Sequence, residues 1–126
     1  MKLAYIDTSV LVAIAYGEEG HKEIASRLSD LDRAFASNIV EAELHALLSA
    51  EGHKKETGRL TRCLTWVYPH RPLSQEYARI LAAGKAAGTA LWHLACALYL
   101  QEEVGELAFL SADTQQAELA TRLGLA

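Results

Sequence analysis

Short apolar runs alternate along the chain with longer stretches in which apolar residues recur at helical spacing. The runs at residues 3–6, 34–37 and 107–110 have the length and the apolar character of buried strands. Strands that alternate with helices are typical of a parallel sheet, so we expect an α/β fold with a short central parallel sheet and helices on both faces. The expected helices cover residues 10–16, 18–28, 38–51, 53–67, 75–83, 89–101 and 114–123.

Polar residues and glycines between these elements indicate where several helices begin and end. The Asp7-Thr8-Ser9 cluster follows the first strand and is able to cap the next helix, which Gly17 ends. Asn38 and Ser74 are placed to cap two later helices. No linker, repeat or low-complexity stretch divides the 126 residues, which therefore predict a single domain over residues 1–126.

The charge and the apolar content of the chain exclude several classes of protein. Twelve Lys and Arg against sixteen Asp and Glu give a net charge of -4, which excludes a uniformly basic nucleic-acid binder but not a local basic patch. No apolar run approaches the roughly 20 residues that span a bilayer, and Asp7 interrupts the apolar stretch that resembles a signal peptide. Cys63 and Cys96 are therefore expected to be reduced thiols of a cytoplasmic protein that makes no membrane contact.

Three acidic residues lie at the end of a strand or on an apolar helix face. Asp7 follows the first strand directly, and Asp113 follows the last strand after two small residues. Ligands bind at the carboxyl ends of the strands in open parallel sheets, so both aspartates are expected to face one crevice. Glu43 shares a helix face with apolar residues at spacings of three and four. The structural alternatives are helix caps at Asp7 and Asp113, and a half-exposed Glu43 at a groove edge.

Three carboxylates gathered in one hollow favour a bound cation. Burying one unpaired carboxylate costs several kcal/mol, and three together also repel one another. Hard oxygen ligands suit Mg²⁺ or Mn²⁺ rather than Zn²⁺, and such a metal binds phosphate oxygens and activates water. We therefore expect Asp7, Glu43 and Asp113 to be the metal-binding and catalytic residues of a phosphodiester hydrolase. Pairing of these acids with a distant Arg is the alternative.

A nucleic-acid substrate also needs a positively charged surface. Residues 53–62 are the most basic segment, in which Lys54, Lys55, Arg59 and Arg62 outnumber a single glutamate. Three of them, at positions 55, 59 and 62, share one face of the expected helix. This face is suited to track a phosphate backbone, and an ordinary solvated helix explains it equally well.

Three short motifs, each built around one of the acids, occur in order along the chain. They are YIDTSVL at residues 5–11, VEAEL at residues 40–44, and LSAD at residues 110–113, which Ala117 and Gly124 follow. Their order, their spacing and the length of the chain resemble those of PIN-domain proteins, specifically the VapC ribonuclease toxins of bacterial toxin–antitoxin pairs. The resemblance implies a PIN-like fold and a Mg²⁺-dependent endoribonuclease in which Asp7, Glu43 and Asp113 are the family's acids.

The chain departs from this family at one acidic position. The resemblance implies a further Asp, a direct metal ligand, just before the helical sequence LWHLACA at residues 91–97, but Ala90 stands there. No acidic residue lies between Glu76 and Glu102 to replace it. The change, natural or introduced, preserves the helix because Ala is an excellent helix former, but it predicts impaired metal binding and catalysis. His93 is interpreted as a core or groove histidine with a satisfied hydrogen bond rather than as a substitute ligand.

The resemblance also implies partners. They are an RNA substrate, a second copy of the chain in a homodimer, and a VapB-like antitoxin whose tail crosses the acidic groove. An antitoxin Arg would compete with metal for the carboxylates, and the helices expected at residues 10–28 and 39–48 offer an apolar strip for such contacts. Thr8, Ser9 and Ser111 are expected to bond a carboxylate or the scissile phosphate, with helix capping as the alternative.

Two other functions compete with the ribonuclease. The first is a non-catalytic PIN module that binds an antitoxin or RNA without cutting. The second is another α/β protein with an acidic pocket, such as a phosphoreceiver or a haloacid-type phosphatase. This second function is disfavoured, because the phosphatase motif needs an acid at position 9, where Ser9 stands, and a receiver needs a late Lys, whereas no Lys follows Lys85.

Overall fold

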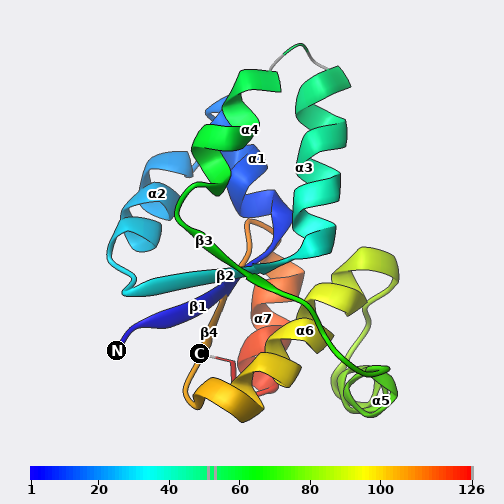
Figure 1. Ribbon diagram of the computed structural model, residues 1–126. Helices are drawn as coiled ribbons and strands as arrows, with labels where there is room; N and C mark the ends of the chain where they lie inside the picture. Colours follow the sequence, from blue (N-terminus) through cyan, green and yellow to red (C-terminus); the bar gives the residue numbers. More distant parts are fainter. Residues whose placement is uncertain (51, 53, 126) are drawn as a thin grey trace.

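A parallel sheet forms the centre of the protein (Figure 1). The structure is a computed structural model that describes residues 1–50, 52 and 54–125, with the side chains of residues 54–56 excepted. The strands in this part of the chain are β1 (Leu3–Ile6), β2 (Arg33–Ser37), β3 (Leu64–Val67) and β4 (Ala108–Leu110). They pair in parallel in the order β3-β2-β1-β4, so the first strand lies between the second and the last. The predicted α/β fold with a central parallel sheet is confirmed.

Helices cover both faces of this sheet, as the sequence pattern predicts. The described helices are α1 (Thr8–Tyr16), α2 (His21–Ser29), α3 (Asn38–Ala50), α4 (Lys54–Thr61), α5 (Ser74–Ala83), α6 (Gly88–Val104) and α7 (Thr114–Arg122). In Figure 1, α1 to α4 lie on the upper side of the sheet and α5 to α7 on the lower side. None of the described helices is both long and apolar enough to cross a membrane.

Alternate residues of the strands enter two apolar cores. Tyr5 pairs in register with Phe35 and Phe109, and these three rings belong to the core under α5, α6 and α7. The neighbouring Ala4 and Ile6 belong to the other core, under α1 and α3. Because successive side chains of a strand point to opposite faces, one short sheet anchors both groups of helices. This arrangement holds α3 on one face of the sheet and α6 on the other, at the same ends of the strands.

Two sequence expectations about the middle of the chain are wrong. The helix expected over residues 53–67 ends at Thr61, and Leu64–Val67 is the edge strand β3, which pairs with β2. Residue 53 lies outside the described residues. The LTWV sequence of β3 has β-branched and aromatic residues that suit a strand, and pairing with β2 overrides the helical spacing. Ser74 does not cap α5, because the N-cap residue is Leu73 and no side-chain bond caps this helix.

Arg71 ties the start of α5 to the rest of the lower layer. Its guanidinium donates to both carboxylate oxygens of Glu76, with Nη1–Oε1 at 2.9 Å and Nη2–Oε2 at 2.7 Å. The same guanidinium lies 5.1 Å from the centre of the Tyr99 ring. The bond from Arg71 lowers the pKa of Glu76 below its ordinary value, despite the opposing effect of burial.

The substitution Glu76→Gln is expected to lower the melting temperature by several degrees at neutral pH. Because the pKa of Glu76 is lower in the folded protein, its ionised form stabilises the fold above the ordinary Glu range, and this contribution is lost as the pH falls. Melting curves between neutral pH and about pH 3 should therefore show the gap to the unmodified protein narrowing. The exposed Glu118→Gln serves as the matched control. A gap that is constant with pH would contradict this account of the ion pair.

Candidate functional site

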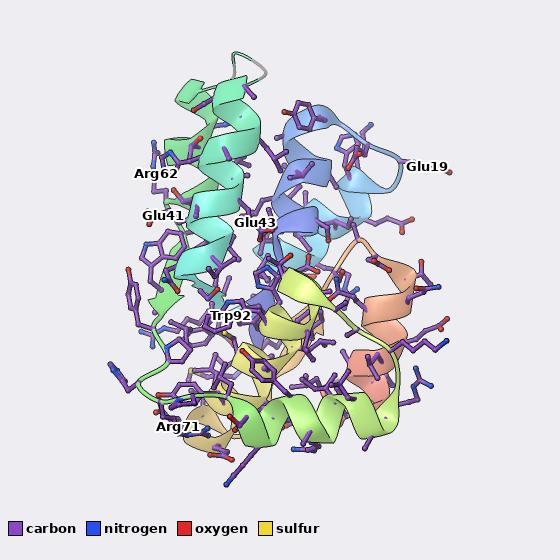
Figure 2. All side chains as sticks on the ribbon, turned by 90° about the vertical axis from the view of Figure 1, so that its right-hand side faces the viewer. Glu19, Glu41, Glu43, Arg62, Arg71 and Trp92 are labelled. Atoms are coloured by element: carbon purple, nitrogen blue, oxygen red, sulfur yellow. The ribbon has the colours of Figure 1, made fainter. Side chains whose placement is uncertain are left out.

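The candidate site lies at the carboxyl ends of β1 and β4. Asp7 follows β1, and its backbone N–H donates to the carbonyl oxygen of Leu110, the last residue of β4, at 3.2 Å. The turn after β1 and the turn after β4, which carries Ser111 and Asp113, therefore lie side by side. Glu43 approaches from α3 and faces α1 in Figure 2. These residues therefore gather at the ends of the two strands, and the crevice expected there from the rule for parallel sheets stays a prediction.

Asp7 is a buried carboxylate that does not cap its helix. It occupies the N-cap position of α1, yet its side chain makes no capping bond and is only 2% exposed. Instead, the Ser9 hydroxyl donates to Oδ1 of Asp7. Burial raises the pKa of Asp7 above its ordinary value, and the hydroxyls of Ser9 and Ser111 offset only part of this increase. The capping alternative is thus wrong for Asp7.

Ser9 and Ser111 connect the two turns. Their Oγ atoms lie 3.3 Å apart, and the Ser9 Oγ also accepts a bond from the backbone N–H of Ala112 at 2.9 Å. The Ser111 Oγ accepts from the backbone N–H of Asp113 at 3.0 Å. The expected bond from Ser9 to a carboxylate is confirmed. The two serines hold the segment after β1 against the segment after β4.

Asp113 has a different role from Asp7. It is exposed, and its Oδ1 accepts from the backbone N–H groups of Gln115 at 2.9 Å and Gln116 at 3.4 Å. These bonds cap α7 and satisfy N–H groups that have no partner within the helix. The capping alternative is therefore confirmed for Asp113, and any bond to a ligand is left to its other carboxylate oxygen.

Glu43 is held by two hydrogen-bond donors at one oxygen. The Thr8 hydroxyl donates to Oε1 at 2.7 Å, and Nε2 of His93 lies 3.0 Å from the same atom. Its side chain is 30% exposed, which agrees with the position at a groove edge that was the alternative expectation. Burial on its own would raise the pKa of Glu43, but the bonds from Thr8 and His93 outweigh it and leave the pKa below its ordinary value. Glu43 is therefore ionised at neutral pH.

His93 connects Glu43 to a buried tyrosine. Its ring is 3% exposed, and Nδ1 lies 2.8 Å from the hydroxyl of Tyr5. An ionised carboxylate only accepts hydrogen bonds, so Nε2 of His93 carries the proton that it donates to Glu43. In the neutral ring Nδ1 is then the acceptor for the Tyr5 hydroxyl, whose pKa burial raises well above the ordinary value. The interpretation of His93 as a core histidine with satisfied bonds is confirmed.

The beginning of α6 lies beside Glu43. The Thr89 hydroxyl contributes to lowering the pKa of Glu43, and Ala90 is the next residue of the helix. Ala90 is partly buried, so a side chain at this position points neither fully into the core nor fully into solvent. His93, three residues further along α6, bonds Glu43, so position 90 lies on the face of the helix that is turned toward Glu43. The acid that the family resemblance expects is missing from the edge of the candidate site.

The described residues do not make a complete metal centre. No group of three or more His, Cys, Asp or Glu side chains in the described part of the chain is arranged to hold a metal ion. The donors that are present, carboxylate and hydroxyl oxygens, are the kind that Mg²⁺ and Mn²⁺ prefer. The carboxylates are too few to hold a metal by protein ligands alone, so the site fits these metals in donor type and leaves further ligand positions to water or a substrate phosphate.

Hydrogen bonds, rather than ion pairs with Lys or Arg, hold the acids of the site in the described part of the chain. Among the described residues, no Lys or Arg forms an ion pair with Asp7, Glu43 or Asp113. Hydroxyl donors and a raised pKa accommodate Asp7, and Thr8 with His93 accommodates Glu43. Hydrogen bonds outweigh the effect of burial on the pKa of Glu43 but offset it only in part for Asp7, so the expectation that a positive charge offsets the burial of these acids stays a prediction.

The substitution Asp7→Asn is expected to raise the melting temperature at pH 7 by about 2–5 °C. Because the pKa of Asp7 is higher in the folded protein than in the unfolded chain, its ionisation at neutral pH destabilises the fold, and this penalty disappears below the ordinary Asp value of 3.8. Melting curves should therefore show the gain at pH 7 and none at about pH 3. Asp113→Asn, which keeps a capping oxygen, should change little. A lower melting temperature for Asp7→Asn at pH 7 would contradict the assignment.

The basic segment begins near the far end of α3 from the sheet and runs back along α4 toward β3. Residue 53 and the side chains of Lys54 and Lys55 lie outside the described residues, so the shared basic face stays a prediction. Arg59 and Arg62 are described and exposed. In Figure 2, Arg62 lies beside α3 at the upper left, at a distance from Trp92 near the sheet.

Sequence reasoning missed the hydrogen-bonded chain that supports Glu43. The roles of Tyr5 and Thr8 depend on partners that are 88 and 35 positions away along the chain. A tyrosine in the middle of a buried strand was one signal, because a buried hydroxyl needs a hydrogen-bond partner. The pattern does not reveal which residue provides that partner.

Comparison with known proteins identifies the family. A model of the family described as PIN domain matches residues 4–122, which is nearly the whole chain. The comparison with curated proteins gives no match. PIN domains are generally metal-dependent nucleases and typically use divalent metals. The match over this length, together with the parallel sheet, means that the chain belongs to the PIN-domain family.

Proposed function

We propose that this protein is a VapC-like endoribonuclease of the PIN family whose activity is weakened because Ala90 leaves its metal centre incomplete. The observation that carries the proposal is the surroundings of Glu43. This carboxylate is held ionised by Thr8, the residue that follows Asp7, and by His93. An ionised Glu43 that is held by hydrogen bonds, next to a position that lacks the expected acid, is what remains of a nuclease site after the loss of a single metal ligand.

The two well-supported acids differ in a way that suits hydrolysis of a phosphodiester. Glu43 is ionised and partly exposed, so it is able to bind a cation or to orient a water molecule. Asp7 is buried with a raised pKa, and a nearby cation would favour its charged form. Mg²⁺ often uses only one or two protein carboxylates together with phosphate oxygens of the substrate. RNA binding would therefore help to complete this site.

RNA cleavage by the unmodified protein tests the proposal. Labelled single-stranded RNA should be cut slowly in millimolar Mn²⁺, less in Mg²⁺, and not in the presence of a chelator. The Glu43→Gln variant, which keeps the size of the side chain and removes the charge, should abolish the cleavage. Glu41→Gln on the exposed face of the same helix is the matched control and should retain it. Cleavage that survives both the chelator and Glu43→Gln would overturn the proposal.

A non-catalytic PIN module is the second candidate. It is favoured by the absence of a group of three metal-ligating side chains in the part of the chain that the structure describes. Such a module would bind RNA or an antitoxin without cutting. It would be the better description if neither the unmodified protein nor a variant with an acid restored at position 90 cleaves any RNA.

The partners proposed with this function are a VapB-like antitoxin and a second copy of the chain. Support comes from large apolar side chains that are exposed on the upper helices, Tyr16 on α1 at 39% and Leu47 on α3 at 45%. An antitoxin arginine that reaches Glu43 would form a charge-assisted pair at the crevice. Light scattering of the protein alone should give the mass of a dimer, and Leu47→Asp should shift it to that of a monomer.

A further inference from the structure

One side of α6 carries aromatic side chains that lead away from the candidate site. Trp92 and Tyr99 are seven residues apart, which places them on the same side of the helix about 10 Å from each other along its axis. Both side chains are only partly buried. Both pack against the edge of the core, whose middle other residues of α6 occupy.

Trp92 lies at the border of the candidate site. It is adjacent to His93 in sequence, and its indole Nε1 donates to the Ser37 hydroxyl at the end of β2 at 3.0 Å. Figure 2 shows Trp92 below Glu43, between the lower end of α3 and α6. The bond to Ser37 fixes the ring in one orientation while part of it stays exposed. A fixed, partly exposed indole beside an acidic site is suited to stack on a planar ligand.

Tyr99 lies in a hollow of about 290 Å³ between α6 and the edge strand β3. Phe35, Trp66 and Tyr68 also line this hollow, and Tyr68 is 53% exposed. The hollow therefore continues the aromatic side of α6 beyond Trp92. Its volume is sufficient for a small planar group.

Cationic groups accompany these rings. The Arg33 guanidinium lies 5.9 Å from the centre of the Phe35 ring, and no ion pair holds it among the described residues. Arg71 lies against Tyr99, although it is already paired with Glu76. Glu103 also lines the hollow and would repel phosphate. A polyanion is therefore expected to run along the side of Arg33, with its planar groups turned toward the rings.

We propose that Trp92 and the hollow around Tyr99 form a track on which bases of single-stranded RNA stack as the strand leaves the candidate site. Proteins that bind single strands combine aromatic platforms with neighbouring cations in this way, whereas duplex RNA keeps its bases stacked inside the helix. A separation of about 10 Å fits bases that are not immediate neighbours in an extended strand. The inference rests on the proposed function, because it takes RNA as the ligand, and it adds where the strand lies.

Binding measured without cleavage tests this track. The probe is a fluorescein-labelled single-stranded RNA of about 12 nucleotides, titrated in the presence of a chelator and followed by anisotropy. Tyr68→Ala and Tyr99→Leu should each weaken binding by about five- to 100-fold. The matched control is Leu81→Ala on α5, because Leu81 is 52% exposed and lies outside the hollow. Melting curves of all variants separate lost binding from lost folding.

Two further measurements distinguish stacking from general charge attraction. Binding should quench tryptophan fluorescence, and Trp92→Leu should remove part of that quenching. Arg33→Gln should reduce the slope of log affinity against log salt by about one, the amount expected for one phosphate contact. Duplex RNA of the same length should bind more weakly than the single strand.

The outcomes separate this inference from the proposed function. Loss of binding in the two tyrosine variants and not in Leu81→Ala supports the track, even if the protein cleaves nothing. Equal affinities for both tyrosine variants and the control overturn the track, even if the protein is an active nuclease. Duplex binding as tight as single-strand binding overturns it as well.

Discussion

Ala90→Asp is expected to raise the rate of metal-dependent RNA cleavage by about 100-fold or more. The new carboxylate would lie beside Glu43 at the first turn of α6, where the helix dipole favours a negative charge. It would supply the ligand whose absence leaves the site incomplete. Initial rates on one labelled RNA in Mn²⁺ and in Mg²⁺ measure the effect.

The control for this substitution is Ala90→Asn, because the Asn side chain has nearly the same shape as that of Asp but carries no charge. If the charge completes the metal centre, Asn should give little or no gain. Metal binding provides an independent measurement, since a ligand that binds only the folded state raises the melting temperature. Ala90→Asp should melt at a lower temperature than the unmodified protein in a chelator, because it adds a negative charge next to Glu43, and should recover in Mn²⁺. Equal activity of the Asp and Asn variants would contradict the proposed defect.

His93→Leu is expected to lower the free energy of unfolding by about 2–4 kcal/mol. The substitution removes the partner of the buried Tyr5 hydroxyl and one of the two donors that hold Oε1 of Glu43. A buried polar group that loses its hydrogen bond keeps the full cost of desolvation, and the volume of the leucine cannot compensate for this. Chemical denaturation at neutral pH measures the change.

Two companion variants show whether His93 acts through these bonds. Tyr5→Phe removes only the hydroxyl and should destabilise the protein by less, and the double variant with His93→Leu should cost less than the sum of the two single changes. The pKa of Glu43 should rise in His93→Leu, because a bond that lowers it is gone. Additive costs, or an unchanged pKa of Glu43, would show that His93 does not position this carboxylate.

The sequence is sufficient to predict most of the fold, since each strand and helix has a local cause. The run at residues 3–6 and the helix ending before Gly17 follow from apolar length and from a glycine at a positive φ of 61°. The wrong prediction of a helix at Leu64–Val67 has a different cause. Its four residues become a strand only because β2 offers an edge with which to pair, and the partner begins about 30 residues earlier in the chain.

The sequence indicates the acids of the candidate site but not the contacts that each of them makes. Asp7 and Asp113 have the same local signature, a carboxylate after a short strand, yet one is buried and the other caps a helix. The difference arises from the serine hydroxyls around Asp7 and the free N–H groups next to Asp113. The link from Tyr5 through His93 to Glu43 joins three distant elements, and no periodicity encodes such a link.

The contact between Ser9 and Ser111 has a consequence for the protein during its synthesis. The first strand is synthesised well before β4, its neighbour in the sheet, and before Ser111, which bonds beside Asp7, because 102 positions separate Ser9 from Ser111. A nascent chain that lacks them cannot pair that side of β1 or complete the surroundings of Asp7. The surroundings of Asp7 therefore take shape only after β4 and the turn that carries Ser111 have been synthesised.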